Sequence, residues 1–152
     1  MRVFDDLARF TACVGQELGV SEWMTVDQER VDTFADATGD HQWIHVNREL
    51  AARGPFGTTI AHGYLSLSLL PGLVRQVFRI EGVRMAVNYG LNRVRFPSPV
   101  PVGSRVRVSA ALLSAKEAGG GVEVVLRATL EVEGSGKPAC VAETVGRYYP
   151  EN

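Results

Sequence analysis

Residues 64–78 constrain the fold more strongly than any other part of this sequence, because their first half is apolar on nearly every side. Read as a helix, this segment has no polar face there, and such a helix is stable only when it is buried. Pro71 is expected to kink it, since proline cannot donate a backbone hydrogen bond. Arg75, Gln76 and Arg79 indicate that the far end reaches solvent. The rest of the chain must therefore supply a surface that wraps around a helix.

The pattern beyond residue 83 predicts such a surface. Apolar and polar side chains alternate over 106–112 and 122–132, which is the period of a strand with one buried face. We predict four strands, at about 83–96, 104–116, 122–133 and 139–149, joined as an antiparallel meander. Helices that precede strands favour the α+β class. A curved antiparallel sheet wrapped around one long buried helix, with short overhanging helices, is the hot-dog fold.

Shorter elements are predicted before the long helix. Residues 4–18 read as a helix and residues 20–26 as a short strand. A second helix is expected after the capping-box pattern of Thr25 and Gln28, and Gly39 stands where a helix commonly ends. Residues 40–46 are therefore predicted to form a loop, and residues 47–52 a short capped helix.

The composition argues against several classes of function. A chain of 152 residues fits one domain, here 1–152, and its formal net charge of −1 gives no general attraction to nucleic acid or to an anionic membrane. Cys13 and Cys140 are too few for a disulfide framework or a zinc site of thiolates, so we expect two buried free thiols. The sequence shows neither a signal peptide nor an apolar run of about 20 residues, which favours a cytoplasmic protein.

Asp40 and His45 are the strongest pair of candidate catalytic residues. A carboxylate and an imidazole on one loop can contact the same water, and imidazole exchanges protons near neutral pH. The alternative is that Asp40 caps a turn after Gly39 and that His45 is an ordinary loop histidine. His41 and His45 also have the spacing of zinc ligands on a helix, but Gly39 argues against a helix there. We therefore predict no metal site.

The tripeptide Ala61-His62-Gly63 opens the long apolar helix. The first N–H groups of a helix lack partners within the helix and carry partial positive charge. Because glycine lets a ligand oxygen approach the backbone closely, the N–H of Gly63 is a candidate oxyanion donor. The alternative is an ordinary helix start without a ligand.

Residues 34–45, Phe-Ala-Asp-Ala-Thr-Gly-Asp-His-Gln-Trp-Ile-His, resemble the signature of the MaoC-like dehydratases, also called the hydratase-2 family of (R)-specific enoyl-CoA hydratases. That signature reads aromatic, then Ser/Thr-Gly-Asp-x-Asn-Pro-aliphatic-His, so its acid and its histidine fall on Asp40 and His45. Its helix-start glycine falls on Gly63, and residues 94–97 and 101–104 resemble the strand and Pro/Gly turn that follow. The resemblance covers most of the chain, from residue 20 to residue 148.

One departure separates this sequence from the usual signature. Gln42-Trp43 replaces Asn-Pro, and Trp43-Ile44-His45 resembles the branch related to nodulation protein N. Because the indole is bulkier than proline, the shape of the acyl channel is expected to differ. The stiffening that proline gives is also lost, so packing of the indole must hold the loop.

The resemblance implies an enzyme that hydrates trans-2-enoyl thioesters of coenzyme A or acyl carrier protein to (R)-3-hydroxyacyl thioesters, or dehydrates them in reverse. It implies that Asp40 and His45 hold the reacting water and that Gly63 supplies the oxyanion donor. No cofactor is expected beyond the coenzyme A of the substrate. Subunits of the family pair their sheets side by side, which implies a homodimer. Further candidates for substrate binding are Gln42, Trp43, His62, Asn88 and Arg95, with Arg75, Arg79, Arg93 and Arg105 as additional partners for phosphates.

Two other functions fit the same sequence. A hot-dog acyl-CoA thioesterase would act on related ligands, and the release of free thiol distinguishes it from a hydratase. A non-catalytic acyl-CoA-binding module would be stabilised by its ligand without turnover, but the presence of both Asp40 and His45 argues against it.

Overall fold

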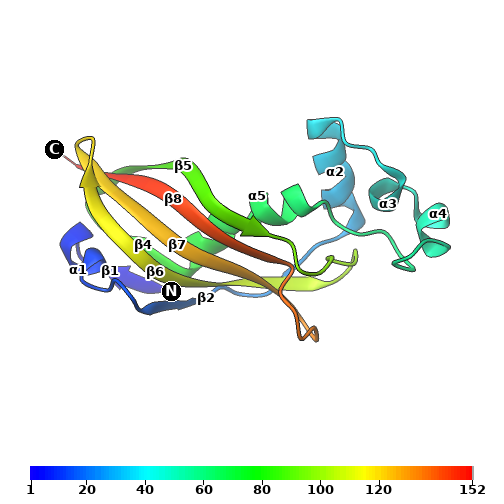
Figure 1. Cartoon of the computed structure of the whole chain (residues 1–152), viewed down its shortest axis with the longest axis horizontal. Coiled ribbons are helices and arrows are strands. Elements are labelled where there is room, and N and C mark those ends of the chain that lie inside the picture. Colours follow the sequence, from blue (N-terminus) through cyan, green and yellow to red (C-terminus); the bar gives the residue numbers. More distant parts are fainter. Residues whose placement is uncertain (152) are drawn as a thin grey trace.

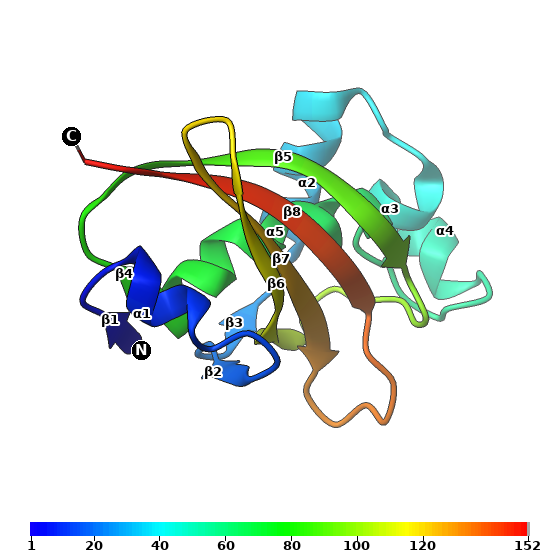
Figure 2. The ribbon, with the colours of Figure 1, turned by 60° about the vertical axis from the view of Figure 1, so that its left-hand side comes forward.

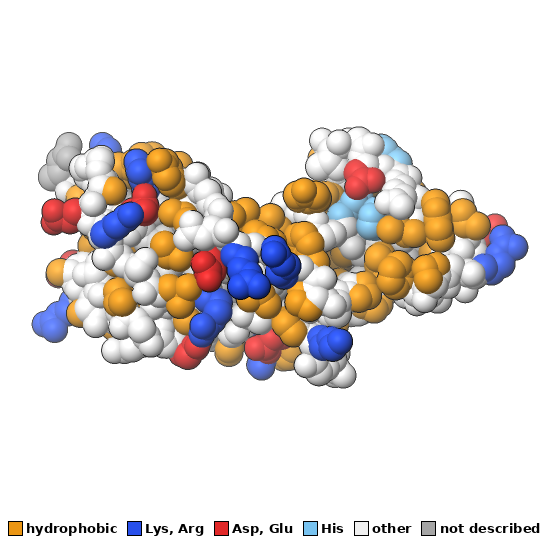
Figure 3. Space-filling model, viewed as in Figure 1, with side chains coloured by type: hydrophobic (Ala, Val, Ile, Leu, Met, Phe, Trp, Pro, Cys, Tyr) orange, Lys and Arg blue, Asp and Glu red, His pale blue; other side chains and the backbone are white. Residues whose placement is uncertain are grey.

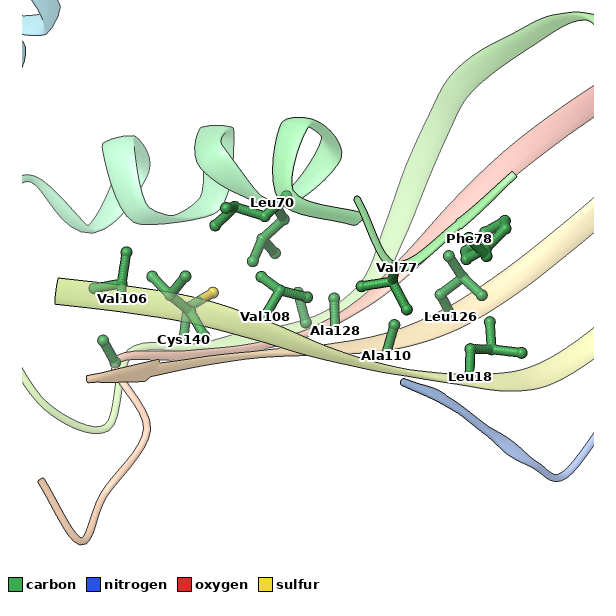
Figure 4. Close-up of a cluster of buried hydrophobic side chains, with 14 of the residues drawn as sticks. Leu18, Leu70, Val77, Phe78, Val106, Val108, Ala110, Leu126, Ala128 and Cys140 are labelled. Atoms are coloured by element: carbon green, nitrogen blue, oxygen red, sulfur yellow. The ribbon is translucent and has the colours of Figure 1, made fainter. Parts of the chain in front are cut away.

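The long apolar segment forms α5 (Gly63–Val77) in the computed structural model, which describes residues 1–151. Figure 1 shows α5 along the concave side of a curved sheet, and in Figure 2 strands of this sheet cross in front of the helix. Leu70 and Val77 of α5 face Val108 and Ala110 of the sheet in the core (Figure 4). The predicted α+β hot-dog arrangement, a curved antiparallel sheet around one long helix, is confirmed. Despite Pro71, α5 continues as one helix.

Four long strands lie within two residues of their predicted bounds. They are β5 (Val83–Arg95), β6 (Arg105–Ala118), β7 (Gly121–Val132) and β8 (Cys140–Pro150). Every second residue of β7 is buried from Val124 to Leu130, so the predicted alternation is confirmed. The alternation of apolar and polar residues in the sequence was therefore sufficient to locate the strands on which α5 packs.

The predicted meander of four strands is wrong in one respect. With β2 (Glu17–Val20) at one edge, the strand order is β2-β6-β7-β8-β5. Strands β6, β7 and β8 are therefore neighbours in sequence order, but β5 pairs with β8 and not with β6. The connection from β5 to β6 spans residues 96–104 and contains Pro97, Pro99 and Pro101. Proline lacks an N–H for a strand ladder, and hairpin loops usually have two to five residues. This connection is therefore free to join strands that are not neighbours.

The N-terminal part also differs from the prediction. Where one helix was expected over 4–18, the chain forms β1 (Arg2–Phe4), the short α1 (Leu7–Thr11) and β2 (Glu17–Val20), followed by β3 (Met24–Thr25). Packing outweighs local helical spacing here, because β1 pairs with β4 (Phe78–Ile80) and the ring of Phe10 stacks on Phe78 at 5.0 Å. Gly15 has a φ of 87°, a conformation that a helix does not allow.

The segment between β3 and α5 forms a lobe of three helices that overhangs one end of the sheet (Figure 1). The lobe consists of α2 (Gln28–Thr38), α3 (Trp43–Val46) and α4 (Arg48–Ala52). The N-cap of α2 is Asp27, which accepts a hydrogen bond from the Arg30 N–H, so the predicted capping box at Thr25 is wrong. The predicted stop at Gly39 is confirmed, with a φ of 78°. Residues 43–46 form a helical turn where a loop was expected.

Two further features bear on the predictions. Cys13 and Cys140 are buried free thiols, as expected. Among residues 1–151, no helix is both long and apolar enough to cross a membrane.

Candidate active site

Asp40 lies directly after the left-handed residue that ends α2. Gly39 donates its N–H to the Ala35 carbonyl and turns the chain out of the helix, so Asp40 leaves a rigid helix end. The side chain of Asp40 is exposed, and its Oδ1 accepts the N–H of Gln42 at 3.3 Å. The carboxylate is thus accessible, and its position is set by the end of α2.

His45 lies on the helical turn α3 and is buried, with 6% of its surface exposed. Its Nδ1 is 2.7 Å from the Ile60 carbonyl, and the Ile60 N–H in turn donates to the Ile44 carbonyl at 3.0 Å. Because a carbonyl only accepts, the neutral ring carries its proton on Nδ1 and leaves the lone pair of Nε2 available. Burial lowers the pKa of His45 below its ordinary value. The ring is therefore suited to accept a proton.

A third group, His62, completes the cluster. Its ring stacks on that of His45 with centroids 3.8 Å apart, and its Nε2 is 2.9 Å from the backbone carbonyl of Asp40. One side-chain atom each of Asp40, His45 and His62 lie within 4.8 Å of one another. Because hydrogen bonds to water are about 2.8 Å long, one water can bridge two groups at such a separation. In Figure 3, histidine atoms line the wall of the notch between the overhanging lobe and the body of the molecule.

The same three residues form a candidate metal site by distance alone. Their geometry does not favour one, because the rings of His45 and His62 are stacked with only 25° between their planes. A metal lies in the plane of each imidazole that binds it, about 2.0–2.1 Å from the nitrogen. Nearly parallel planes 3.8 Å apart do not meet at one such point.

Gly63 is the first residue of α5, directly after His62. The His62 side chain makes no capping hydrogen bond to this helix, so the first N–H groups of α5 stay available. A Cβ on Gly63 would lie 3.1 Å from the ring of Phe96. A Cβ here would therefore have to displace the Phe96 ring slightly, which favours glycine independently of any contact with a ligand.

Comparison with known proteins identifies the family. The sequence profile described as MaoC like domain matches residues 9–134. The chain is 57% identical over 149 residues to 3-hydroxyacyl-thioester dehydratase Z of Mycobacterium tuberculosis, covering 97% of this chain and 99% of that protein. The chain belongs to the MaoC-like dehydratase family. This membership makes it a hydro-lyase, an enzyme that adds or removes water.

Two further relatives of this MaoC-like dehydratase bear on its branch and fold. It is 49% identical over 142 residues to nodulation protein N of Rhizobium leguminosarum bv. viciae, covering 91% of this chain and 88% of that protein. This confirms the branch indicated by Trp43-Ile44-His45. An (R)-hydratase from A. caviae, involved in PHA biosynthesis, has a TM-score of 0.73 at 26% identity and covers 90% of this chain and 96% of that chain.

The other predicted binding residues of this MaoC-like dehydratase lie around the cluster rather than in it. Trp43, the first residue of α3, packs its indole against Gly54, where a Cβ would be 2.9 Å away. The exposed Gln42 contributes its N–H to Asp40. Asn88 lines a cavity of about 660 Å³ between α5 and strands β5 and β8. Arg95 is exposed at the end of β5 and donates to the Val94 carbonyl.

That cavity lies beside the Asp40–His45 cluster, and neither residue lines it. Its wall begins on α5 at Leu67 and Ser68, one turn beyond Gly63, and includes Arg75 of α5 and Arg79 of β4. Among the candidate phosphate partners, Arg79, Arg93 and Arg105 are all exposed. Arg79 forms an ion pair with Glu81, and Arg105 forms one with Glu133.

Sequence reasoning missed one residue that holds the site, because it treated Gln28 as part of a capping box. The side chain of Gln28 is buried and donates to the His45 carbonyl at 2.7 Å and to Asp32 at 2.8 Å. It also accepts from the Thr59 hydroxyl at 2.6 Å. The available signal was its position three residues before Val31, on the buried face of α2. A polar residue on an apolar helix face indicates a buried hydrogen-bond network.

Proposed function

We propose that this protein hydrates trans-2-enoyl thioesters of coenzyme A or acyl carrier protein to (R)-3-hydroxyacyl thioesters, and catalyses the reverse dehydration. The observation that carries the proposal is the placement of the Asp40 carboxylate and the unprotonated Nε2 of His45 beside the uncapped start of α5. The relatives support it, since they are called a 3-hydroxyacyl-thioester dehydratase and an (R)-hydratase.

The reacting water lies between Asp40 and His45 and donates one hydrogen bond to each. Both groups accept, so the water directs its protons toward them and a lone pair of its oxygen toward the substrate. The oxygen adds to the third carbon of the acyl chain while one of the two groups removes a proton. The same proton then passes to the second carbon, on the face from which water added. General acid–base assistance of this kind contributes roughly 10²–10⁴-fold to a rate.

Addition to the third carbon moves an electron pair onto the thioester oxygen. The N–H of Gly63 at the positive end of α5 stabilises this charge. Loss of one such donor typically costs about 3 kcal/mol of transition-state stabilisation. No cofactor takes part, since the coenzyme A moiety belongs to the substrate.

The test is the hydration of crotonyl-CoA, followed by the loss of its conjugated absorbance. Asp40→Asn and His45→Gln are each expected to lower kcat by at least 10²-fold, because each removes a group that holds or deprotonates the water. Asp36→Asn is the matched control. Asp36 is an exposed acid on α2, the helix that ends just before Asp40, and its carboxylate pairs with His41 at 2.8 Å. Its activity should equal that of the wild type.

Three results would contradict the proposal. In the first, either active-site variant hydrates crotonyl-CoA at the wild-type rate. In the second, the wild type releases free thiol from the substrate, which identifies a thioesterase. In the third, the wild type is stabilised by crotonyl-CoA without turning it over, which identifies a binding module.

We also propose that the enzyme is a homodimer joined through β5. This strand is the last of the sheet, so its outer edge has no strand partner among residues 1–151. Met85, Val87, Tyr89 and Leu91 on β5 are 42–59% exposed, and the neighbouring side of α5 is only partly covered. An exposed, apolar, unpaired edge of this length favours pairing with a second chain.

A further inference from the structure

His62 is buried to 98% although it stands at the N-terminus of a helix and does not cap it. Its Nε2 lies 2.9 Å from the backbone carbonyl oxygen of Asp40. A carbonyl oxygen accepts but never donates, so Nε2 must carry the proton of the ring and Nδ1 the lone pair. His62 therefore donates a hydrogen bond to the main chain of the residue that carries the active-site carboxylate.

The other nitrogen of His62 has no role in folding that would explain a histidine. Its Nδ1 is buried and finds no hydrogen-bond partner within residues 1–151. A buried polar atom without a partner destabilises a folded protein. The ring is packed between that of His45, at 3.8 Å, and that of Phe34, at 4.9 Å. A phenylalanine would fill the same space without an unpaired nitrogen, so the remaining advantage of histidine is its donor to Asp40.

Few other contacts hold Asp40 in position. It follows the left-handed Gly39, it is exposed, and within the described residues it makes two hydrogen bonds. One is the 3.3 Å contact from the Gln42 N–H, which comes from the same short segment. The other comes from His62 and is the one that ties Asp40 to α5.

We propose that His62 is a positioning residue that holds Asp40 and His45 in register with the first turn of α5. Its donor fixes the main chain of Asp40, and its ring face fixes the imidazole of His45. The proposal rests on the proposed hydratase function, in which those two groups share one water. His62 itself does not exchange a proton with the substrate.

Two variants separate positioning from simple packing. His62→Gln retains an Nε2 donor at a similar reach but loses the aromatic ring, whereas His62→Phe retains the ring and loses the donor. Since misplacement of a catalytic group by about 1 Å can cost about 10²-fold in rate, kcat for crotonyl-CoA should fall about 10- to 100-fold in His62→Phe. His62→Gln should recover much of that loss, and KM should change by less than about 3-fold in both variants. Ser66→Ala, at another buried polar residue of α5, is the control and should retain the wild-type kcat.

A second readout does not depend on activity. In labelled protein, ¹⁵N shifts should show His62 as the Nε2–H tautomer and His45 as the Nδ1–H tautomer. The ¹³C shift of the Asp40 carbonyl should move in His62→Phe and stay near its wild-type value in His62→Gln, because only the glutamine retains the donor.

The kinetic and NMR measurements distinguish failure of the positioning role of His62 from failure of the proposed function. If His62→Phe retains the wild-type kcat while His62→Gln loses it, the ring acts only by packing and the inference is wrong. An Nδ1–H tautomer of His62, or an unchanged Asp40 carbonyl shift in His62→Phe, overturns it as well. If the wild type does not hydrate crotonyl-CoA but these shifts are as expected, the contact to Asp40 stands and the proposed function has failed.

Discussion

At the scale of single residues, the chemistry of this site depends on which ring nitrogen carries a proton. The Ile60 carbonyl fixes the proton of His45 on Nδ1, and the Asp40 carbonyl fixes that of His62 on Nε2. Two backbone carbonyls thus set the states of both buried imidazoles. As a result, the Nε2 of His45 is the nitrogen left to accept a proton from water.

The pH dependence of the reaction should report whether the His45 ring is neutral or protonated. Burial disfavours the charged form of His45 and so lowers its pKa below the ordinary value of 6.5. The ring is neutral above this lowered pKa and can accept a proton, whereas below it the ring is protonated and cannot. A profile of kcat/KM against pH should therefore fall on its acid side with an inflection below 6.5.

His41→Gln is the control for this profile. The exposed His41 has a raised pKa because of its hydrogen bond to Asp36, so its titration would appear above 6.5. The acid limb should persist in His41→Gln. An inflection above 6.5 that disappears in this variant would instead assign the profile to His41 and contradict the role of His45.

The roles of these residues differ in how far the sequence predicts them. Asp40 and His45 were predicted from their match to the family's motif, and the structure brings these two side chains together. The contacts of His62 and Gln28 could not be predicted from the sequence, because both side chains donate to backbone carbonyls. Every residue has a backbone carbonyl, so no pattern of side chains marks the partner. The tertiary structure is needed to bring them together.

At the scale of elements, prediction succeeds where one side of an element is buried within this chain. Strands β6 and β7 alternate between buried and exposed residues, and their bounds were predicted closely. The helix predicted over residues 4–18 was wrong, because the apolar residues of this segment make contacts with β4 and do not form one continuous helix face. The turn α3 was missed because four residues are too few to show a helical period.

The packing of α3 makes a testable prediction about Gly54. In Gly54→Ala the new Cβ would lie 2.9 Å from the Trp43 indole and 3.3 Å from the Ala51 carbonyl, so the indole must move. Since Trp43 begins the turn that carries His45, kcat for crotonyl-CoA should fall about 10-fold. The free energy of unfolding, measured in urea, should fall by about 1–3 kcal/mol.

Gly72→Ala is the matched control for this substitution. Nothing lies within 4 Å of a Cβ at Gly72, which is an exposed residue within α5. Alanine should stabilise the helix there by roughly 0.5–1 kcal/mol and leave kcat unchanged. A Gly54→Ala variant with wild-type kcat would show that the indole does not position His45.

At the scale of the whole molecule, β5 is the element that the isolated chain does not explain. It is thirteen residues long, almost every residue on it is exposed, and it borders the partly open side of α5. The apolar first half of this segment predicted a buried helix, yet Tyr64 near its start is 71% exposed. In the proposed dimer a second chain would cover this side of α5, which would explain why the sequence pattern overstated the burial of the helix.

A dimer through β5 can be tested by measuring the mass in solution with light scattering. The wild type is expected to have twice the mass of the 16.5 kDa chain. The double variant Val87→Glu, Leu91→Glu should have the mass of a single chain, because like charges would meet across a symmetric interface. Val14→Glu, at an apolar residue of similar exposure outside β5, should remain dimeric. A monomeric wild type, or a double variant with unchanged mass, would contradict the interface.

The position of the candidate site within the chain has a consequence for how this enzyme can change over time. Asp40, His45, His62 and Gly63 all lie within residues 40–63, and the bond from Ile60 to Ile44 closes that stretch on itself. The groups to which the proposed mechanism assigns a role are thus encoded together, whereas Gln28 and the residues that line the neighbouring cavity act on them from other parts of the chain. Under the proposed function, a gene segment that encodes residues 40–63 would therefore carry the reacting groups together, while substitutions in the cavity wall would change the fit of the substrate.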